Sequence, residues 1–470
     1  MKYTHDVIVI GAGSAGLTAA GGCAMLGLKP ALIERGEMGG DCLNSGCVPS
    51  KAIIAAAHRA HDMRNSAPLG IKSVEPKVDF KAVHDHIHEA IATIAPEDSQ
   101  ERFEEMGVDV RRGEATLVND RTVSVNGEEL TAPRIVIATG SRAFVPPIDG
   151  IKDVPYLTNE TLWDLTELPD HMIVLGGGPI GMEMAQSFRR LGSKVTVIEM
   201  FRPFANDDDE AAELVMQHLE GEGIEIHAQT KAIKVSRKDG IITVHTEDGK
   251  ALSGSHLLVA TGRAVNFDSL GLENAGVEYD RGGIKVDERR RSSNKRIYAI
   301  GDCRHGPRFT HSSGYEGSNI VLEVALGLPT KVDYSALPWV TYADPELAQV
   351  GLTEKAAREK FGDKITTWRE DFSHNDRAIT EKDKAGFVKI VKKGSKVVGA
   401  TIVGRHAGDL LLPWSMAIKG KSSTFGIASL IVPYPNRAEH SKAAAFASDE
   451  AKVFNKWSMG WAKFLAKMRR

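Results

Sequence analysis

Two cysteines, Cys42 and Cys47, have the spacing of a pair that could carry redox chemistry. The five-residue step between them would rise about 7.5 Å on a regular helix, whereas a disulfide requires Cα atoms closer than about 7 Å. The segment must therefore depart from a regular helix, and Gly46 gives it the freedom to do so. We expect a bond made under this constraint to be reduced more readily than a relaxed structural disulfide. Two ordinary buried thiols are the alternative.

The chain holds only four cysteines, Cys23, Cys42, Cys47 and Cys303. This number is too small for a secreted disulfide scaffold, and in a reducing cytosol a close cysteine pair is typical of catalysis or metal binding. No second cysteine pair or cluster of histidines completes four zinc ligands. The sequence therefore favours a catalytic pair without a metal site.

A pattern of strand, glycine turn, helix, strand and acid occurs twice, at residues 6–34 and 172–199. The first glycine makes the turn, the second lets a pyrophosphate approach the backbone, and the third lets helix and strand pack closely. Free N–H groups at the helix N-terminus hold the pyrophosphate, and the acid accepts a hydrogen bond from a ribose hydroxyl. The pattern predicts two bound dinucleotides rather than two glycine-rich turns without ligands. The residues are Gly11, Gly13, Gly16 and Glu34 in the first copy and Gly176, Gly178, Gly181 and Glu199 in the second.

Three further apolar segments, at residues 135–140, 257–262 and 297–302, read as strands. The first two end in Thr-Gly, and we expect each to return the chain to its parent dinucleotide-binding sheet. The third ends in Gly-Asp and is expected to be another buried strand. From Leu337 onward, strands near residues 386–391 and 397–403 alternate with apolar helices, which indicates a separate α+β domain.

The composition excludes several other functions. A chain of 470 residues with 42% hydrophobic residues and a net charge of −3 is typical of an ordinary globular protein. It has no basic field of the kind that binds nucleic acid. No run of about 18 apolar residues is present, and the apolar start at residues 7–10 continues into a glycine turn rather than a signal-peptide cleavage site. We expect a cytoplasmic protein.

The sequence resembles the flavin-dependent pyridine nucleotide–disulfide oxidoreductases, which include dihydrolipoamide dehydrogenase, glutathione reductase and mercuric reductase. The similarity covers nearly the whole chain and includes the cysteine segment, Phe309-Thr310-His311, and residues 345–354 and 386–389. The resemblance implies two Rossmann-like dinucleotide-binding domains and a C-terminal α+β dimerisation domain. The expected boundaries are residues 1–150 and 263–335 for the FAD-binding domain, 151–262 for the NAD(P)-binding domain, and 336–470 for a homodimer interface.

The resemblance also implies a role for each residue that matches a family motif. Cys47 matches the flavin-proximal thiolate that forms a charge-transfer complex, and Cys42 matches the interchange thiol that meets substrate. Lys51 and Glu183 match an ion pair near the flavin N5, although an ordinary surface salt bridge is the alternative for this pair. The first glycine turn matches the FAD fingerprint, the second matches the nicotinamide fingerprint, and Asp302 matches the acid near the ribityl–phosphate portion of FAD. Further expected cofactor-binding residues are Arg35, Gly40, Asp41, Lys51, Thr139, Gly140, Gly262, Gly301 and His311.

One departure from the family concerns the catalytic base. Family disulfide reductases carry a His-Pro-Thr…Glu segment near the C-terminus, and here Tyr434 replaces the histidine while Glu439 is retained. Histidine titrates at about 6.5 and tyrosine at about 10, so Tyr434 can donate a hydrogen bond but is a poor base at neutral pH. His440 is the alternative base. Mercuric reductase has a similar tyrosine, but this chain has no cysteine after Cys303 to deliver a metal ion.

Two other departures affect the cofactor and the substrate. Pro179 stands where family members often have an aromatic gate over the nicotinamide pocket. Glu199 would repel a 2′-phosphate, which favours NAD(H) over NADP(H), although Arg202 could partly offset this repulsion. Arg377 could contact an anionic substrate or could be an ordinary surface charge.

The last twenty residues have the pattern of a basic amphipathic helix. Such a helix could lie on a membrane surface or dock a partner, or it could pack on the dimer with its lysines in solvent. The apolar stripe consists of Phe454, Trp457, Trp461, Phe464, Leu465 and Met468, and the basic residues are Lys452, Lys456, Lys463, Lys467 and Arg470.

The leading functional hypothesis is an oxidoreductase that passes electrons from NADH through FAD to the Cys42–Cys47 disulfide. The final acceptor would be a small-molecule or protein disulfide, or a dithiol in the reverse direction. We expect a depressed pKa to help the Cys42 thiolate. Because Tyr434 removes the usual thiol base, a reductase of a metal ion, quinone or other small oxidant is the second hypothesis. A redox sensor without turnover is the third.

Overall fold

The computed structural model describes residues 2–469, and the chain divides into two compact units. Unit 1 contains residues 1–61, 76–200 and 225–332, and unit 2 contains residues 62–75, 201–224 and 333–470. Both glycine turns lie in unit 1. Segments 62–75 and 201–224 belong to unit 2, although the sequence-based boundaries place them in the nucleotide-binding domains. The three-domain boundaries stay a prediction.

The first glycine turn belongs to a five-stranded parallel sheet with the strand order β19-β7-β1-β2-β3. The four residues of β1 are all buried, as expected for a strand covered on both faces. The Thr-Gly segment forms β7 beside β1, and the Gly-Asp segment forms β19 beside β7. The strands are β1 (Val7–Ile10), β2 (Pro30–Glu34), β3 (Asp109–Arg112), β7 (Ile135–Ile137) and β19 (Ile297–Ala299).

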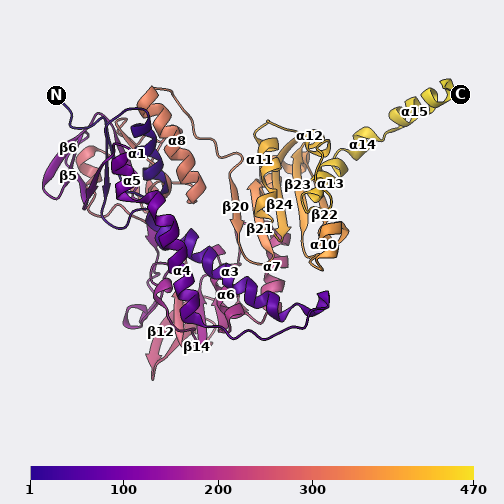
Figure 1. Ribbon diagram of the computed structural model, residues 1–470, viewed down its shortest axis with the longest axis horizontal. Helices are drawn as coiled ribbons and strands as arrows, with labels where there is room; N and C mark the ends of the chain where they lie inside the picture. The colour runs from indigo at the N-terminus through magenta and orange to yellow at the C-terminus, as the bar shows by residue number, and fades with distance from the viewer. Residues whose placement is uncertain (1, 470) are drawn as a thin grey trace. The chain divides into compact units, whose positions relative to one another are not determined.

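Helices α1 and α8 pack closely on this sheet and lie side by side in Figure 1. A Cβ on Gly22 would lie 2.6 Å from a methyl of Val321, and a Cβ on Gly317 would lie 2.8 Å from the carbonyl oxygen of Ala15. This close contact fixes the N-terminus of α8 relative to the first glycine turn. The helices of this part are α1 (Ser14–Met25), α2 (Gly40–Asn44), α3 (Cys47–Arg64), α4 (Phe80–Ile94), α5 (Gln100–Glu105) and α8 (Thr310–Leu326).

The second glycine turn belongs to a four-stranded parallel sheet with the order β11-β10-β9-β15. The second Thr-Gly segment forms β15 beside β9, as predicted. Helix α6 (Pro179–Leu191) follows the turn. The strands are β9 (His171–Leu175), β10 (Lys194–Ile198), β11 (Glu225–His227) and β15 (His256–Val259).

Small antiparallel sheets complete unit 1. One of them pairs two strands that follow the Thr-Gly segments, so it connects the two parallel sheets. The strands are β4 (Ala115–Leu117), β5 (Thr122–Val125), β6 (Glu128–Thr131), β8 (Ser141–Ala143), β12 (Ala232–Lys238), β13 (Ile241–Thr246), β14 (Ala251–Gly254), β16 (Arg263–Val265), β17 (Tyr279–Asp280) and β18 (Gly283–Ile284).

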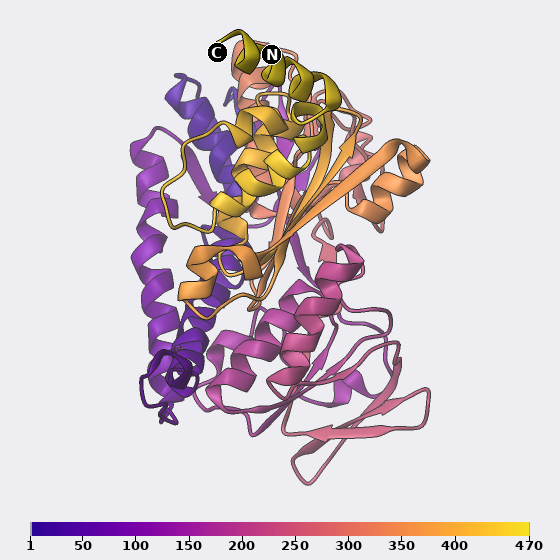
Figure 2. The same ribbon diagram turned by 90° about the vertical axis from the view of Figure 1, so that its right-hand side faces the viewer.

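Unit 2 is built on a five-stranded antiparallel sheet with the order β20-β21-β24-β23-β22, whose strands run side by side in orange in Figure 2. The two strands predicted here form as β23 and β24, and helices cover the sheet, so the α+β assignment is confirmed. The elements are β20 (Pro338–Thr341), β21 (Glu346–Gly351), β22 (Ile365–Asp371), β23 (Phe387–Lys393), β24 (Lys396–Gly404), α7 (Asp209–Gly221), α9 (Glu354–Phe361), α10 (Asp376–Thr380), α11 (Leu412–Ile418), α12 (Thr424–Ala428) and α13 (Glu439–Ala447).

The C-terminal segment forms two helices rather than one, α14 (Glu450–Val453) and α15 (Lys456–Met468). The predicted single amphipathic helix is therefore too long, because Lys452 and Phe454 precede α15. The break has a local cause: the Asn455 side chain accepts hydrogen bonds from the next helix's N–H groups and caps it. Arg470 lies outside the described residues. Within residues 2–469, no helix is long and apolar enough to cross a membrane.

Candidate active site and dinucleotide sites

The cysteine pair lies where α2 ends and α3 begins. Cys42 is on α2, Cys47 is the first residue of α3, and Ser45 and Gly46 separate the two helices. A Cβ on Gly46 would lie only 2.8 Å from the carbonyl oxygen of Asp41, so the turn needs a glycine here. The predicted departure from a regular helix is confirmed. Both sulfurs are free thiols, and the interaction between them shifts the pKa of each.

Hydrogen bonding gives the two thiols opposite acidities. The hydrogen bond from Cys42 is the main reason why the pKa of Cys47 is lowered to about 6; Thr310 and the charge of Lys51 lower it further, and burial opposes them. The Thr310 Oγ1 lies 3.2 Å from the Cys47 Sγ. The same hydrogen bond, together with burial, raises the pKa of Cys42 above its usual range. The expected depressed pKa at Cys42 is therefore wrong for the reduced pair, in which Cys47 is the thiolate and Cys42 keeps its proton.

Lys51 on α3 and Glu183 on α6 form an ion pair, with 2.9 Å between Nζ and Oε2. The Glu183 side chain is 7% exposed and that of Lys51 is 40% exposed. Lys51 follows Cys47 by about one helical turn, and its charge contributes to the lowered pKa of that thiol. The buried acid distinguishes this pair from an ordinary surface salt bridge.

A chain of polar contacts connects the cysteine helix to the loop after β19. Asp41 Oδ2 lies 3.1 Å from Arg263 Nη2, and Asp41 Oδ1 accepts a hydrogen bond of 2.9 Å from Asn159. Arg263 Nε donates to Ser141 Oγ at 2.7 Å, and Ser141 Oγ donates to Asp302 Oδ2 at 2.8 Å. Two predicted site residues, Asp41 and Asp302, therefore share one network. The central arginine of this network, Arg263, was not predicted as a site residue, although it directly follows a predicted Thr-Gly strand end.

The glycines of the first turn differ in what the protein itself requires of them. A Cβ on Gly11 would lie 2.4 Å from the carbonyl oxygen of Ala138, and a Cβ on Gly16 would lie 1.8 Å from that of Gly11. A Cβ on Gly13 would meet nothing closer than the Gly40 Cα at 4.0 Å, and its φ of −83° suits any residue. Internal packing therefore explains why Gly11 and Gly16 are glycines, but it does not explain the glycine at position 13. An open approach to the N-terminus of α1 explains it, and a pyrophosphate fits there.

The second turn repeats this arrangement. A Cβ on Gly176 would lie 2.4 Å from the carbonyl oxygen of Ala260, and a Cβ on Gly181 would lie 2.0 Å from that of Gly176. Around Gly178, whose φ is −79°, a Cβ would meet no described atom within 4 Å. The N-terminus of α6 is therefore also open to a pyrophosphate.

The acid that follows each glycine turn, Glu34 or Glu199, is hydrogen bonded to the backbone of that turn. Glu34 Oε2 accepts a hydrogen bond of 2.6 Å from the Ala12 N–H, and Glu199 Oε2 accepts one of 2.6 Å from the Gly177 N–H. The two carboxylates therefore have equivalent, fixed positions beside their turns. Such a position suits the recognition of ribose hydroxyls.

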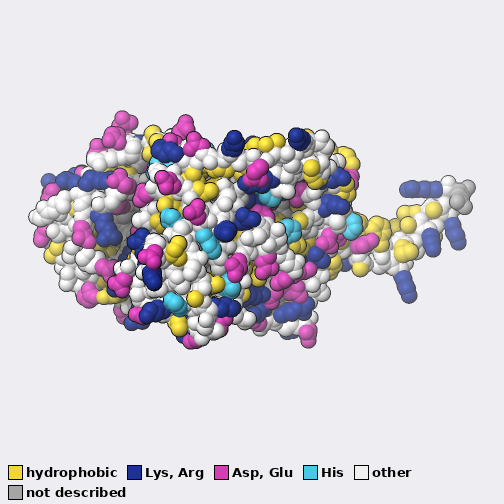
Figure 3. Space-filling view, turned by 90° about the horizontal axis from the view of Figure 1, so that it is seen from below, with side chains coloured by type: hydrophobic (Ala, Val, Ile, Leu, Met, Phe, Trp, Pro, Cys, Tyr) yellow, Lys and Arg dark blue, Asp and Glu magenta, His cyan; other side chains and the backbone are white. Residues whose placement is uncertain are grey.

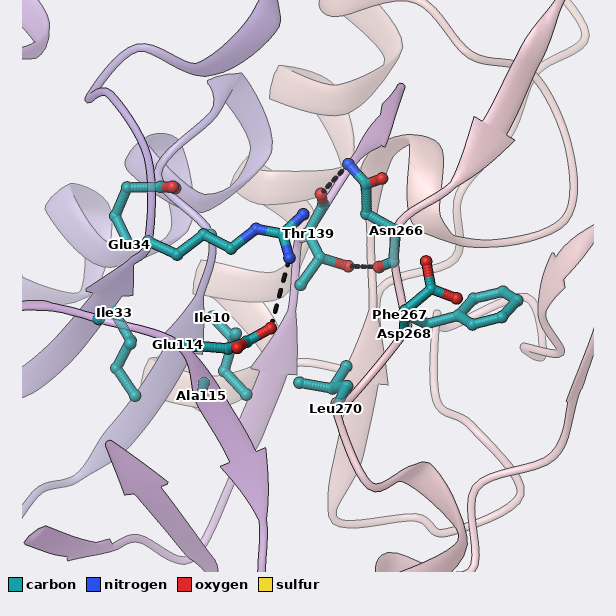
Figure 4. Close-up of a pocket in the computed structure, with 13 residues that line it drawn as sticks. Ile10, Ile33, Glu34, Glu114, Ala115, Thr139, Asn266, Phe267, Asp268 and Leu270 are labelled. Carbon is teal, nitrogen blue, oxygen red and sulfur yellow. Dashed lines mark hydrogen bonds and ion pairs between the residues drawn. The ribbon is translucent and has the colours of Figure 1, made fainter. Parts of the chain in front are cut away.

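A pocket opens beside Glu34 at the ends of β1, β2 and β7 (Figure 4). Arg35 on its rim lies 3.5 Å from Glu114. The Thr139 hydroxyl donates to the Asn266 carbonyl oxygen, and the Asn266 side-chain amide donates to the Thr139 carbonyl oxygen at 3.2 Å. Apolar side chains beside a carboxylate held by the glycine turn suit the adenosine end of a dinucleotide. The lining residues are Ile10, Gly11, Ile33, Glu34, Arg35, Gly113, Glu114, Ala115, Thr139, Asn266, Phe267, Asp268 and Leu270.

The backbone of the Gly301–Asp302 loop is hydrogen bonded to a buried ion pair. The Gly301 N–H donates to Glu316 Oε2 at 2.7 Å. Glu316 also pairs with Arg304 at 2.5 Å, and both side chains are fully buried. This network fixes the backbone that carries Asp302, while the Asp302 side chain turns to Ser141.

The other predicted cofactor-binding residues border the same turns. Gly140 and Gly262 have φ values of 67° and 140°, which disfavour other residues. A Cβ on Gly40 would lie 2.7 Å from the Gly13 Cα, so the cysteine helix begins against the first turn. His311 is the second residue of α8, and its ring stacks on Phe309 at 5.2 Å between centroids.

Tyr434 and Glu439 lie in unit 2. The Tyr434 side chain is exposed, and its hydroxyl donates to Asp376 Oδ2 at 2.6 Å, which raises the pKa of Tyr434. Glu439 accepts a hydrogen bond of 3.2 Å from the Asn436 N–H. Tyr434 therefore remains protonated at neutral pH, as its residue type suggests.

The other two candidate site residues of unit 2, His440 and Arg377, have partners within this unit. His440 is 4% exposed, hydrogen bonds to the Asp371 carbonyl oxygen at 2.6 Å, and has a pKa lowered by burial. It is not accessible to an external substrate and does not replace the missing histidine. Arg377 pairs with Glu381 on the surface.

Comparisons with known proteins identify the family. Residues 5–317 match the profile of the pyridine nucleotide-disulphide oxidoreductases, and residues 337–445 match the dimerisation domain of the same enzymes. The chain therefore belongs to the pyridine nucleotide–disulfide oxidoreductase family. It is a FAD-dependent NAD(P)H disulfide oxidoreductase with FAD and a pyridine nucleotide as cofactors, and its dimerisation domain supports a homodimer.

Individual relatives differ in the acceptors for which they are named. Mercuric reductase from Bacillus cereus is 35% identical over 456 residues, which are 96% of this chain and 72% of that enzyme. Dihydrolipoyl dehydrogenase from Geobacillus stearothermophilus is 34% identical over 452 residues, which are 94% of this chain and 95% of that enzyme. The HOCl-induced flavoprotein disulfide reductase RclA from Escherichia coli, solved as a Cu(II) complex, is similar with a TM-score of 0.84 and 28% identity over 93% of this chain and 99% of that one.

Proposed function

We propose that the enzyme takes electrons from NADH and passes them, by way of FAD, to the Cys42–Cys47 pair and then to an external disulfide. The observation that supports this proposal is the asymmetry of the reduced pair. The interaction between the two thiols lowers the pKa of Cys47 and raises that of Cys42, and the Thr310 Oγ1 lies 3.2 Å from the Cys47 Sγ. The Lys51–Glu183 ion pair lies beside it. Two sulfurs of unequal charge suit a division of roles, in which Cys47 faces the flavin and Cys42 meets the substrate.

FAD would be held by the first turn and its surroundings. The N-terminus of α1 at Gly13 would receive the pyrophosphate, Glu34 the adenosine ribose and the neighbouring pocket the adenine. Asp302 would meet the ribityl–phosphate portion, and Lys51 would supply a positive charge beside the ring. When bound, FAD accepts a hydride from NADH and delivers two electrons to the disulfide.

NADH is the preferred nucleotide in this proposal. The N-terminus of α6 at Gly178 would receive its pyrophosphate, and Glu199 would accept hydrogen bonds from its ribose. The fixed carboxylate of Glu199 would repel a 2′-phosphate. Arg202 does little to offset this repulsion, because its guanidinium pairs with Asp209.

The dithiol step then takes place between the two cysteines and the substrate, after Cys42 has lost its proton. Deprotonated Cys42 attacks one sulfur of the acceptor disulfide, breaks its S–S bond and releases the first thiolate. The Cys47 thiolate attacks the Cys42 sulfur of the mixed disulfide, releases the second thiolate and closes the Cys42–Cys47 bond. The acceptor gains two electrons, and its two thiolates take up the Cys42 proton and one proton from solvent.

A small oxidant or a soft metal ion is the second candidate acceptor. The observation that favours it is the Tyr434 hydroxyl, which is hydrogen bonded to Asp376 and cannot take a proton from Cys42 at neutral pH. Such an acceptor needs no thiol base. The mercuric reductase and the RclA complex with Cu(II) are relatives whose names agree with this chemistry.

Anaerobic titration with NADH followed by an acceptor panel tests the proposal. We expect a long-wavelength thiolate–flavin absorbance after two-electron reduction, which Cys47→Ser abolishes and Cys42→Ser retains. Turnover with a disulfide should be lost in both variants. The same band in Cys47→Ser would contradict the assignment of the sulfurs. Turnover with metal ions or quinones but not with disulfides would select the second candidate, and no turnover with any acceptor would indicate a redox sensor.

A further inference from the structure

Helix α15 has an apolar face that its own unit leaves uncovered. The side chains of Trp457, Trp461, Phe464 and Met468 are between 49% and 76% exposed. The rings of Trp457 and Trp461 stack at 6.4 Å between centroids, and those of Trp461 and Phe464 stack at 5.5 Å. Large apolar side chains therefore form one continuous strip. In Figure 1, α15 extends away from the sheet of unit 2.

The charge of this segment is opposite to that of the rest of the chain. Residues 451–470 contain six lysines and arginines and no acid. Removing these six charges from the net −3 leaves −9 for the other residues. The projecting segment shows hydrophobic and basic side chains in Figure 3. Within residues 2–469, Lys456, Lys463 and Lys467 have no carboxylate at ion-pair distance.

The basic residues flank the apolar strip. At about 100° per residue, the aromatic residues and Met468 share a narrow arc of α15. Lys456, Lys463 and Lys467 lie along one edge of this arc and Arg469 along the other. Lysine and arginine at such edges can extend their charged ends toward phosphates while the apolar strip is buried. This arrangement is typical of a helix that lies in the plane of a membrane surface.

The segment that precedes α15 is held by a buried ion pair, while the helix itself lies beyond the part of the chain that matches the dimerisation domain. Lys392, which is fully buried, binds Asp449 at 2.8 Å just before α14. The match to the dimerisation domain ends at residue 445. The Asn455 side chain caps α15, and the large apolar side chains of the helix are exposed. These contacts hold the start of the segment and leave its apolar strip to an external surface.

We propose that α15 binds the surface of an anionic lipid membrane, with the strip of Trp457, Trp461, Phe464 and Met468 in the interface and the flanking basic residues on lipid phosphates. Charge complementarity favours an anionic membrane, because every charged residue of the segment is basic. A neutral surface would attract only its apolar strip. Tryptophan is also the residue that membrane interfaces favour. The proposal is independent of the electron acceptor.

Co-sedimentation of the full-length FAD-loaded enzyme with vesicles tests this proposal. The vesicles consist of phosphatidylcholine alone or of phosphatidylcholine with phosphatidylglycerol. We compare the wild type with Trp457→Ala/Trp461→Ala/Phe464→Ala and with Lys456→Glu/Lys463→Glu/Lys467→Glu. The matched control, Lys72→Glu/Lys238→Glu/Lys396→Glu, makes the same charge change at exposed lysines elsewhere. Bound FAD and NADH oxidation verify that every variant is folded.

We expect the wild type and the control to bind anionic vesicles and to bind neutral vesicles at least about tenfold more weakly. Both α15 variants should lose at least about tenfold in binding to anionic vesicles, and salt should weaken binding of the wild type. Failure of the wild type to sediment with anionic vesicles would overturn the proposal. Equal binding by the α15 variants would also overturn it. If the α15 variants bind vesicles like the wild type but differ from it in oligomeric state, the strip contacts a second copy of the chain instead.

Discussion

Arg263 lies 3.1 Å from Asp41, the residue that directly precedes the Cys42 thiol. The same guanidinium donates to Ser141, which in turn binds Asp302. A charged group between two acids thus connects the helix of the cysteine pair to the loop expected at the flavin. The arginine side chain is only 16% exposed, so these contacts are shielded from solvent. We interpret Arg263 as a positioning residue for the redox pair.

Replacing Arg263 should therefore affect the dithiol more than the flavin. In Arg263→Met, Asp41 loses its charged partner at a cost of about 1.5–3 kcal/mol, and we expect disulfide turnover to fall by about tenfold or more. NADH oxidation with an acceptor that takes electrons directly from the flavin should change by less than about threefold. Arg111→Met removes an arginine that pairs with Asp109 at a distance from the cysteines and serves as the control. Equal losses with both acceptors would contradict a positioning role.

Thr310 should set the pH range in which Cys47 is a thiolate. Its hydroxyl lies 3.2 Å from the sulfur and contributes to the lowered pKa of about 6. In the wild type the thiolate is present above about pH 6 and is protonated below it. In Thr310→Val the lost hydrogen bond should raise this midpoint by about one unit, measured by thiolate absorbance of the reduced enzyme against pH. Thr243→Val is the control and should leave the midpoint unchanged. An unchanged midpoint in Thr310→Val as well would show that Thr310 does not influence the Cys47 thiolate.

Local features of the site could be predicted from the sequence, and long-range features could not. The two dinucleotide-binding motifs were predictable because the glycine turn, the helix and the acid of each motif lie within about thirty residues of one another. The acidity of Cys47 depends in part on Thr310, which is 263 residues away in the chain. The sequence alone therefore led to a lowered pKa being expected at Cys42 instead. Arg263 reaches Asp41 through the pairing of β8 and β16, which no local pattern encodes. The continuous apolar stripe predicted a single helix here, and the break at Asn455, which caps α15, was not predicted.

The fixed carboxylate of Glu199 should set the choice of nicotinamide cofactor. Glu199→Gln keeps an acceptor for a ribose hydroxyl but removes the charge that repels a 2′-phosphate. We expect the ratio of kcat/KM for NADH to that for NADPH to fall by about tenfold. Glu220→Gln makes the same change on the exposed face of α7 and should leave the ratio unaltered. A preference for NADPH in the wild type would contradict the prediction.

The buried Lys392–Asp449 pair should stabilise the end of unit 2. Lys392→Met leaves Asp449 without its main cation and should cost about 3 kcal/mol, measured by chemical unfolding, whereas exposed Lys396→Met should cost little. The hydrogen bonds of Asp449 overcome its burial and lower its pKa to about 2. Because a lowered acid pKa stabilises the fold above the unfolded value of about 3.9, the difference between wild type and Lys392→Met should be constant above about pH 5. It should shrink as the pH falls toward about 2. A difference that grows on acidification would contradict this account.

Tyr434 should limit the reduction of disulfides through the missing proton acceptor. Cys42 keeps its proton because its pKa is raised, so disulfide turnover by the wild type should increase with pH beyond neutrality. Tyr434→His supplies a base whose ordinary pKa is about 6.5, and Asp376, which now binds the tyrosine hydroxyl, can orient the imidazole. We expect disulfide turnover at neutral pH to rise by about 100-fold, the lower range of general base catalysis, and the pH profile to shift downward. Adding Asp376→Asn to Tyr434→His should remove part of this gain, while Tyr434→Phe should remain at or below the wild type. If the histidine variant reduces disulfides no faster and keeps the alkaline profile, proton transfer at residue 434 does not limit the reaction, and an acceptor that needs no thiol base becomes the better assignment.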